Sequence, residues 1–209
     1  MFGDGSLTFQ EFVMNEPLPL ATIHAAVLDF LRDRDDAALF GAQAVNAYVD
    51  EPRMTQDVDL LSPRAAELAG EIREDLGRRF NIAVREREIR EGLGFRVDQV
   101  QKPRNRHLVD IRRIEALPPT ERIGGVLVVV PAELIASKLI AFEQRRGKPK
   151  SGTDWRDLAL LLLKFPGLKE ESGPVRDRLV AAGVGPSLLD AWAAVVAQEI
   201  LPEEEDEDY

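Results

Sequence analysis

The sequence predicts an α+β fold, in which a core of strands flanked by helices is followed by a C-terminal helical region. Short apolar runs bounded by glycine or proline alternate with helical periodicity up to about residue 130. From Pro131 onward, apolar residues recur almost only at helical spacing. The chain is 44% hydrophobic and 31% charged, as is typical of an ordinary globular protein rather than a disordered one.

The change of periodicity near residue 131 and the charge of the C-terminus define the expected domains. Residues 1–130 are expected to form the α/β core, and residues 131–202 the helical region. Six of the last seven residues, in the range 203–209, are acidic. Because like charges repel and extend a chain, this segment is expected to be a disordered acidic tail.

Helical periodicity and helix-breaking residues predict the helices of the core. Ile23 and Val27 begin an amphipathic pattern that continues to Arg34. Pro52 disfavours helix at the residue before it, and the pair Ser62-Pro63 resembles an N-cap followed by proline in the first turn. The expected helices cover residues 20–34, 41 to just before 52, and 62–79.

Apolar runs and alternating patterns predict the strands. In the stretch 107–112, Val109 and Ile111 face one way, whereas Asp110 and Arg112 face the other. The expected strands cover residues 37–40, 57–61, 80–86, 95–100, 107–112 and 126–130.

The helical region begins at Pro131, and its first helix precedes a basic loop at 147–152. Thr153 is expected to cap the next helix. Two further helices are expected at about 175–182 and 186–200, with Trp192 as a packing anchor.

Asp57 and Asp59 are the first candidates for chemistry. Residues two apart on a strand share a face, and two carboxylates there suit Mg²⁺. A later strand offers a third acid, either Asp110 or Asp98. Asp110 is favoured because it lies in the strand with the clearer apolar pattern. The alternative is an acidic face that merely pairs with arginines, for which Arg53 and Arg96 are available.

Composition narrows the possible classes of partner. The formal charge of −10 counts against a broad DNA-binding or other nucleic-acid-binding surface. The absence of cysteine excludes disulfides and thiolate chemistry. No apolar run approaches the roughly 20 residues needed to span a membrane, and no secretory signal pattern is present, so a cytoplasmic location is expected.

His24 and His107 are isolated in sequence and are interpreted as ordinary residues.

Several motifs together resemble the nucleotidyltransferase-like toxins of abortive-infection systems, AbiEii/AbiGii. They are Gly41-Ala42, Arg53-x-Thr55-x-Asp57-x-Asp59, Lys138 on a helix, and Asp154-x-x-Asp157 on the next. The resemblance covers about residues 20–165 and implies the mixed sheet of the polymerase-beta-like nucleotidyltransferases. It also implies Mg²⁺-dependent transfer of a nucleotidyl group from an NTP to an RNA or protein acceptor. Such a protein is typically the toxin of a toxin–antitoxin or phage-defence system, with an antitoxin protein as partner.

The resemblance also implies roles for individual residues. Those implied in metal binding and catalysis are Asp57, Asp59, Asp110 and Lys138, and those implied in substrate binding are Gly41, Ala42, Arg53, Thr55, Asp154 and Asp157. The sequence departs from the family pattern where Ala42 lacks a hydroxyl and where Thr153 replaces a lysine, a place that Lys150 can take. These departures define an alternative, a weak or inactive nucleotidyltransferase fold that binds a nucleotide or a partner.

Overall fold

The computed structural model describes residues 18–202 and divides them into two compact units. The first unit holds residues 18–43 and 53–129, and the second holds residues 44–52 and 130–202. Residues 44–52 therefore group with the helical part of the chain. The acidic tail expected at 203–209 lies outside the described residues.

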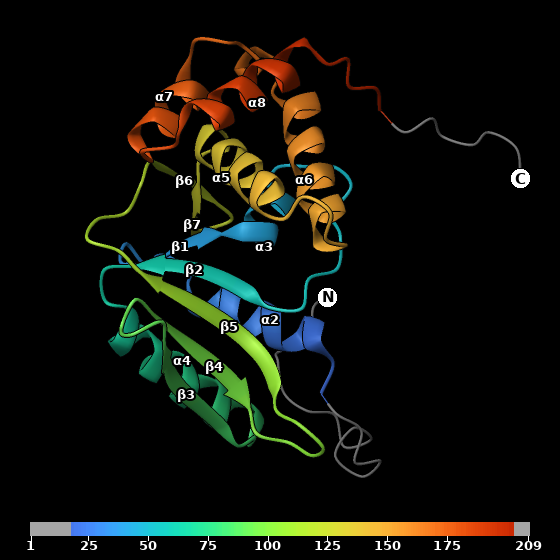
Figure 1. Ribbon diagram of the computed structural model, residues 1–209. Coiled ribbons are helices and arrows are strands. Elements are labelled where there is room, and N and C mark those ends of the chain that lie inside the picture. The colour runs from blue at the N-terminus through green and yellow to red at the C-terminus, as the bar shows by residue number, and fades with distance from the viewer. Residues whose placement is uncertain (1–17, 203–209) are drawn as a thin grey trace, which may run out of the picture. The chain divides into compact units, whose positions relative to one another are not determined.

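A seven-stranded mixed sheet forms the first unit (Figure 1). Its strands are β1 (Ala38–Phe40), β2 (Val58–Ser62), β3 (Val84–Ile89), β4 (Gly94–Gln99), β5 (Arg106–Arg113), β6 (Thr120–Ile123) and β7 (Val126–Val129). The order across the sheet is β3-β4-β5-β2-β1-β7-β6. The pairs β2–β5 and β1–β7 are parallel, and the other neighbours are antiparallel. The predicted α+β class is confirmed.

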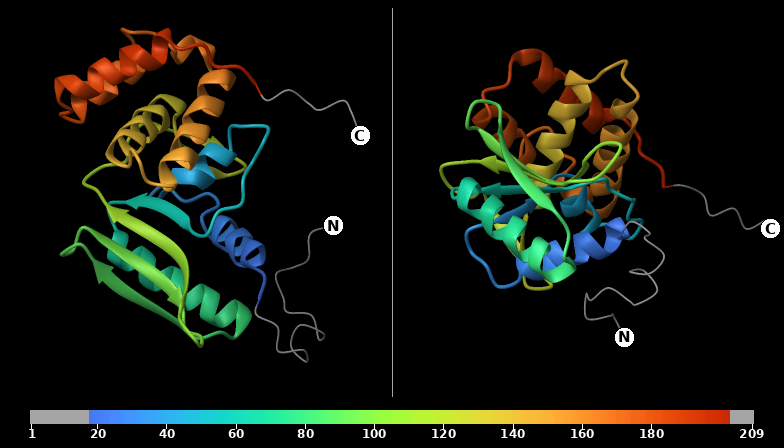
Figure 2. Two further views of the ribbon diagram at one scale, coloured as in Figure 1. Left: turned by 45° about the vertical axis from the view of Figure 1, so that its right-hand side comes forward. Right: turned by 90° about the horizontal axis from the view of Figure 1, so that it is seen from below.

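Two helices cover one face of this sheet, α2 (Leu20–Phe30) and α4 (Ala65–Phe80) (Figures 1 and 2). The predicted apolar stripe of α4 is buried, since Leu68, Ile72 and Leu76 are at most 1% exposed. α4 packs against β2 to β5, and α2 packs against α4 and β5. Polar side chains that alternate with the buried strand residues therefore face away from these helices.

The chain differs from the predicted elements at several places. The helix expected over 20–34 ends at Phe30, and the helix expected from 41 to just before 52 ends at Asn46. The strand expected over 80–86 is wrong at its start, because α4 continues through the buried ring of Phe80, four positions after Leu76. Asn81 then ends the helix in left-handed backbone with a φ of 51°. The strand β6 was not expected, because it is a short, mainly polar segment that pairs with β7 at the edge of the sheet.

The second unit is helical. Its helices, beyond residue 130, are α5 (Pro131–Gln144), α6 (Lys150–Lys164), the 3₁₀ helix η1 (Pro166–Leu168), α7 (Pro174–Ala181) and α8 (Pro186–Ala197). α5 packs against α6, α7 and α8. Trp192 is 1% exposed and its Nε1 donates to the carbonyl oxygen of Glu170 at 3.0 Å, which confirms it as a packing anchor.

The start of α6 is earlier than predicted. The helix begins at Lys150, so Thr153 is not its N-cap; the Thr153 hydroxyl instead donates to the carbonyl oxygen of Lys150 at 2.8 Å. Pro149 precedes the helix with a φ of −54°, a value already suited to helical backbone. Among the helices that the structure describes, none combines the length and the apolar character required to cross a membrane.

Candidate active site

The turn between β1 and α3 (Gly41–Asn46) requires glycine. Phe40, the last residue of β1, lies opposite Asp59 of β2, and Gly41 follows it with a φ of +69°. A Cβ atom on Gly41 would lie 2.8 Å from both Cβ and Cγ of Asp59 and closer still to its Oδ2. Only glycine therefore lets this backbone approach the Asp59 carboxyl group so closely.

The pairing of β2 with β5 brings two predicted acids side by side. Asp59 and Asp110 are direct partners in this parallel pair, so their side chains project from the same face. Asp57 precedes the first residue of β2 and is 31% exposed, compared with 25% for Asp110. The structure thus gathers Asp57, Asp59 and Asp110 at one side of the sheet, away from α4.

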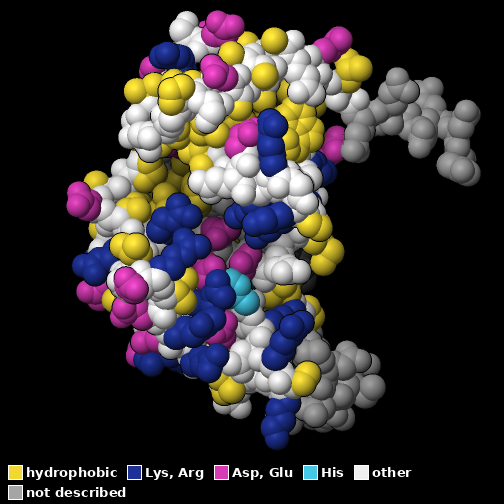
Figure 3. Space-filling model, viewed as in Figure 1, with side chains coloured by type: hydrophobic (Ala, Val, Ile, Leu, Met, Phe, Trp, Pro, Cys, Tyr) yellow, Lys and Arg dark blue, Asp and Glu magenta, His cyan; other side chains and the backbone are white. Residues whose placement is uncertain are grey.

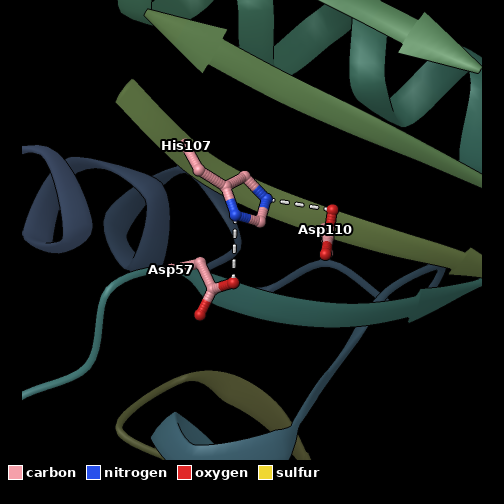
Figure 4. A group of neighbouring side chains, drawn as sticks. All are labelled: Asp57, His107 and Asp110. Carbon is pink, nitrogen blue, oxygen red and sulfur yellow. Dashed lines mark hydrogen bonds and ion pairs between the residues drawn. The ribbon is translucent and has the colours of Figure 1, made fainter. Parts of the chain in front are cut away.

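His107 lies between two of these acids (Figure 4). Its Nδ1 is 3.2 Å from Oδ2 of Asp57, and its Nε2 is 3.0 Å from Oδ1 of Asp110. One ligand atom from each of these three residues lies within 4.8 Å of the others, an arrangement that can hold a metal ion. The structure therefore places His107, which the sequence analysis interpreted as an ordinary residue, within the acidic cluster.

A β-bulge explains how His107 reaches this face. Val97 pairs with Val109, but the next residue of β4, Asp98, pairs with His107, so that Leu108 is an extra residue in β5. Without it, residues 107 and 110 would point to opposite faces, because they are an odd number of positions apart. The alternation of apolar and polar residues in the sequence does not reveal this bulge. The position of His107 beside the acids was therefore not predicted.

Arg96 holds Asp110 through two parallel hydrogen bonds. Its Nε donates to Oδ1 and its Nη2 to Oδ2 of Asp110, each at 2.8 Å. Burial alone raises the pKa of Asp110, but hydrogen bonds from His107 and Arg96, together with their charges, outweigh it and hold that pKa well below its ordinary value. Asp110 is therefore ionised at any physiological pH.

The same contacts act on His107 in the opposite direction. Burial lowers the pKa of His107, but the hydrogen bond and the negative charge of Asp110, helped by the charge of Asp57, raise it above the ordinary histidine value. The positive charge of the imidazole and the negative charges of the two carboxylates therefore stabilise one another.

Asp98, the other candidate for the third acid, is engaged elsewhere. It is 4% exposed and lies 3.2 Å from Nε of Arg87 and 3.5 Å from Nη2 of Arg85, both on β3. Asp110, and not Asp98, is the acid that stands beside Asp59.

A shallow pocket opens next to the paired acids. It is lined by Asp59 and Asp110, by the turn between β3 and β4, and by Arg90 and Arg112. The guanidinium of Arg112 lies 5.2 Å from the ring centroid of Phe40. Figure 3 shows basic and acidic side chains gathered on this face of the sheet around a histidine. The pocket therefore joins carboxylates to cationic side chains, a combination suited to a phosphate group and its counter-ion.

A chain of polar contacts links two of the predicted motifs. Nε2 of Gln43, two positions after Gly41, donates to the hydroxyl of Thr55 at 2.7 Å and lies 3.3 Å from Nδ1 of His24. Thr55 is thus held at the base of the loop that leads to Asp57. Nearby, Arg53 donates to the carbonyl oxygen of Met54 at 3.4 Å.

The remaining predicted site residues lie in the second unit, except Ala42, which is the second residue of α3. Nζ of Lys138 is 2.6 Å from Oδ2 of Asp157 and 4.0 Å from Oδ1 of Asp154. Asp154 also accepts a hydrogen bond from Arg145 at 2.6 Å. Lys138, Asp154 and Asp157 are 7%, 3% and 1% exposed, so the helical unit holds a buried network of charges.

Comparison with solved structures shows which fold this is. JHP933 from Helicobacter pylori aligns with a TM-score of 0.53 at 15% identity over 91% of this chain and 90% of its own. The antibiotic-resistance factor ANT(2'')-Ia aligns with a TM-score of 0.51 at 17% identity over 84% of this chain and 92% of its own. The polyadenylate synthase of Megavirus has a TM-score of 0.56 at 14% identity over 70% of this chain, which spans 32% of that enzyme. At these identities the likeness establishes the nucleotidyltransferase fold alone.

Sequence comparison identifies the family. No curated protein matches the chain. A family model described as the nucleotidyl transferase AbiEii toxin of type IV toxin–antitoxin systems matches residues 25–184, more than half of the chain. This range includes the paired acids of β2 and β5 and the buried Lys138–Asp157 pair. The chain therefore belongs to the AbiEii family of nucleotidyltransferase toxins.

Proposed function

We propose that this nucleotidyltransferase moves a nucleotidyl group from an NTP to an RNA or protein acceptor in a Mg²⁺-dependent reaction. The observation that carries the proposal is the pairing of Asp59 with Asp110 across β2 and β5, with Gly41 held against the Asp59 carboxyl group. In such a reaction an acceptor hydroxyl attacks the α-phosphorus of the NTP and pyrophosphate leaves.

The side chains at this face fit a divalent cation. The carboxylates project from neighbouring strands, and ligand atoms of Asp57, His107 and Asp110 already lie within 4.8 Å of one another. Asp57 and Asp59 would hold the Mg²⁺, with Asp110 as the third acid. When bound, the cation neutralises negative charge on the triphosphate and polarises the phosphoryl oxygen.

The surroundings of Asp110 favour one of its two possible roles. A general base must accept a proton, but the contacts from Arg96 and His107 lower the pKa of Asp110 and oppose its protonation. Asp110 is therefore better suited to act as a permanently charged ligand or to orient a neighbour. Arg90 and Arg112, which line the same pocket, would attract the phosphates.

The family assignment supports a biological role as well. We propose that the protein is the toxin component of a toxin–antitoxin or phage-defence system of the abortive-infection kind, acts on the NTP pool of the cytoplasm, and is neutralised by an antitoxin protein.

A second candidate function is that of a nucleotidyltransferase fold with little or no activity. Two observations favour it: Ala42 offers no hydroxyl to a phosphate, and Arg96 occupies both oxygens of Asp110. Such a protein would bind a nucleotide or a partner without transferring a nucleotidyl group.

Substitution of Asp59 tests the proposal. Asp59→Asn is expected to weaken Mg²⁺-dependent NTP binding and transfer by on the order of 100-fold, the scale seen when one charge-stabilising group is removed from an active site. Binding is measured by calorimetry, and transfer with labelled NTPs and cellular RNA or protein. Asp35→Asn is the control, because Asp35 is 87% exposed and outside the acidic cluster.

Two outcomes of these binding and transfer measurements would contradict the proposal. Undiminished NTP binding by Asp59→Asn overturns the metal assignment. Tight binding by the unmodified protein without any labelled product favours the second candidate.

A further inference from the structure

We propose that His107 is a metal ligand, and that with Asp57 it makes this site bind Mn²⁺ more tightly than Mg²⁺. The inference concerns the site of the proposed function, but it is a statement about metal binding and does not depend on nucleotidyl transfer. It assigns Asp110 the task of orienting the imidazole.

The two proposed ligand atoms, one on His107 and one on Asp57, lie at a distance that suits a shared metal ion. Metal–ligand bonds of about 2.0–2.2 Å at right angles place neighbouring ligand atoms about 3 Å apart. Nδ1 of His107 and Oδ2 of Asp57 are separated by 3.2 Å. These two atoms therefore already have the spacing of adjacent ligands of one ion.

A hydrogen bond on the other side of the ring orients the imidazole. Nε2 of His107 lies 3.0 Å from Oδ1 of Asp110. A ring hydrogen on Nε2 directs the lone pair of Nδ1 toward Asp57. Histidine ligands in proteins are commonly held by such a carboxylate, which fixes the tautomer and makes the free nitrogen a better donor.

Arg96 determines how strongly Asp110 can attract a cation. Its two hydrogen bonds fix the Asp110 carboxylate in one orientation and compensate its charge. A compensated carboxylate attracts a divalent cation less strongly but remains a good acceptor for Nε2. The site thus relies less on ionic attraction, which Mg²⁺ and Mn²⁺ share, and more on the nitrogen ligand, which distinguishes them.

The choice of ion follows from ligand chemistry. Mg²⁺ prefers oxygen ligands and gives up its water reluctantly, whereas imidazole suits transition metals. Asp59, two positions after Asp57, adds another oxygen on the same side of the sheet. A site with carboxylate oxygens and one imidazole nitrogen is therefore better suited to Mn²⁺.

The test compares affinities for Mn²⁺ and Mg²⁺, each supplied as the chloride to protein without a polyhistidine tag. Calorimetry at fixed pH is expected to show Mn²⁺ bound at least about 10-fold more tightly than Mg²⁺. In His107→Asn the affinity for Mn²⁺ is expected to fall by about 10-fold to 100-fold. The affinity for Mg²⁺ should change less than about 3-fold. His24→Gln is the control and should keep the preference.

A second measurement follows metal binding to the unaltered protein and uses a variant only to assign the signals. The chain contains two histidines, so ¹⁵N-labelled imidazole gives two sets of signals, assigned with the His24→Gln protein. Substoichiometric Mn²⁺ is expected to broaden the His107 signals before those of the buried His24.

Two results would overturn the inference. One is equal affinity of the unaltered protein for both ions. The other is a gain in affinity for both ions in His107→Asn, which would show that the imidazole only locks the carboxylates. If the Mn²⁺ preference is absent while labelled NTP transfer persists, this inference alone fails. If the preference is present without transfer or NTP binding, the proposed function fails and the metal site stands.

Discussion

At the scale of single residues, the two histidines occupy opposite electrostatic environments. His107 lies against two carboxylates, which raise its pKa. His24 is 6% exposed, and burial lowers its pKa despite the charge of Asp57. Its Nε2 has no hydrogen-bond partner among the described residues.

His24 should therefore make the protein less stable in mild acid. Its pKa in the folded state lies below the unfolded value of about 6.5, so below that pH the unfolded chain binds a proton that the folded chain does not. The free energy of unfolding should fall by up to about 1.4 kcal/mol per pH unit from this residue as pH decreases below 6.5. Urea unfolding between pH 5 and 7, without metal, measures this slope.

His24→Gln should flatten that part of the curve, because glutamine does not titrate. An unchanged slope in this variant would show that His24 accepts its proton in the folded state.

The acids of the candidate site could be predicted from their local spacing alone, and their roles stay a prediction. Asp57, Asp59 and Asp110 were singled out as acids on strands, and the structure brings them to one face. Arg96 had been named as a possible partner of the acids, and it does pair with Asp110. The place of His107 was missed, because it depends on which strands pair and in which register.

At the scale of elements, the turn from β1 to α3 offers a test of close packing. Gly41→Ala should cost about 1–2 kcal/mol from its left-handed backbone alone, with a further penalty from overlap with Asp59. The matched control is Gly147→Ala, since Gly147 has a φ of +78° and nothing within 4 Å of an added Cβ. The difference between the two variants in urea unfolding isolates the overlap. Equal losses would mean that Asp59 simply moves aside.

The contact between α5 and α6 offers a test of burial. Lys138–Asp157 and Lys164–Asp50 both have an N–O distance of 2.6 Å, but the first pair is buried and the second exposed. Lys138→Met should destabilise the protein by about 3–5 kcal/mol, because a buried carboxylate loses its cation. Lys164→Met should cost less than about 1 kcal/mol. Chemical denaturation compares them, and similar losses would contradict the role of burial.

Most elements were predictable, because apolar periodicity directly reflects burial. The errors lie at boundaries. Phe80 extends α4 because its ring joins the buried stripe, and α6 starts before Thr153 because Pro149 already has helical backbone angles. Neither choice is visible in a local pattern, since each depends on what the residue packs against.

At the scale of the whole molecule, ligand binding should stabilise the fold. A Mg²⁺–NTP complex at 100 times its dissociation constant adds about 2.7 kcal/mol to the folded state that binds it. The melting temperature should therefore rise by about 5–10 °C. Thermal unfolding with and without a non-hydrolysable NTP measures the shift, which Asp59→Asn should reduce to about 1 °C at the same ligand concentration. A shift that persists undiminished in this variant would place the nucleotide elsewhere.

The grouping of residues 44–52 with residues 130–202 could not be predicted from sequence. The pattern changes at residue 131, but nothing local ties the earlier segment to the later helices. In the structure, the ring of Tyr48 meets that of Phe165 edge-on, with centroids 5.7 Å apart, and Asp50 pairs with Lys164. These contacts join residues more than a hundred positions apart.

This grouping determines how the protein can be dissected. A polypeptide that stops at residue 130 would keep segment 44–52 but lose the aromatic ring on which Tyr48 packs. The C-terminal fragment, in turn, would lack segment 44–52. Co-expression of the two fragments as separate chains would supply each with the partner that the cut removes.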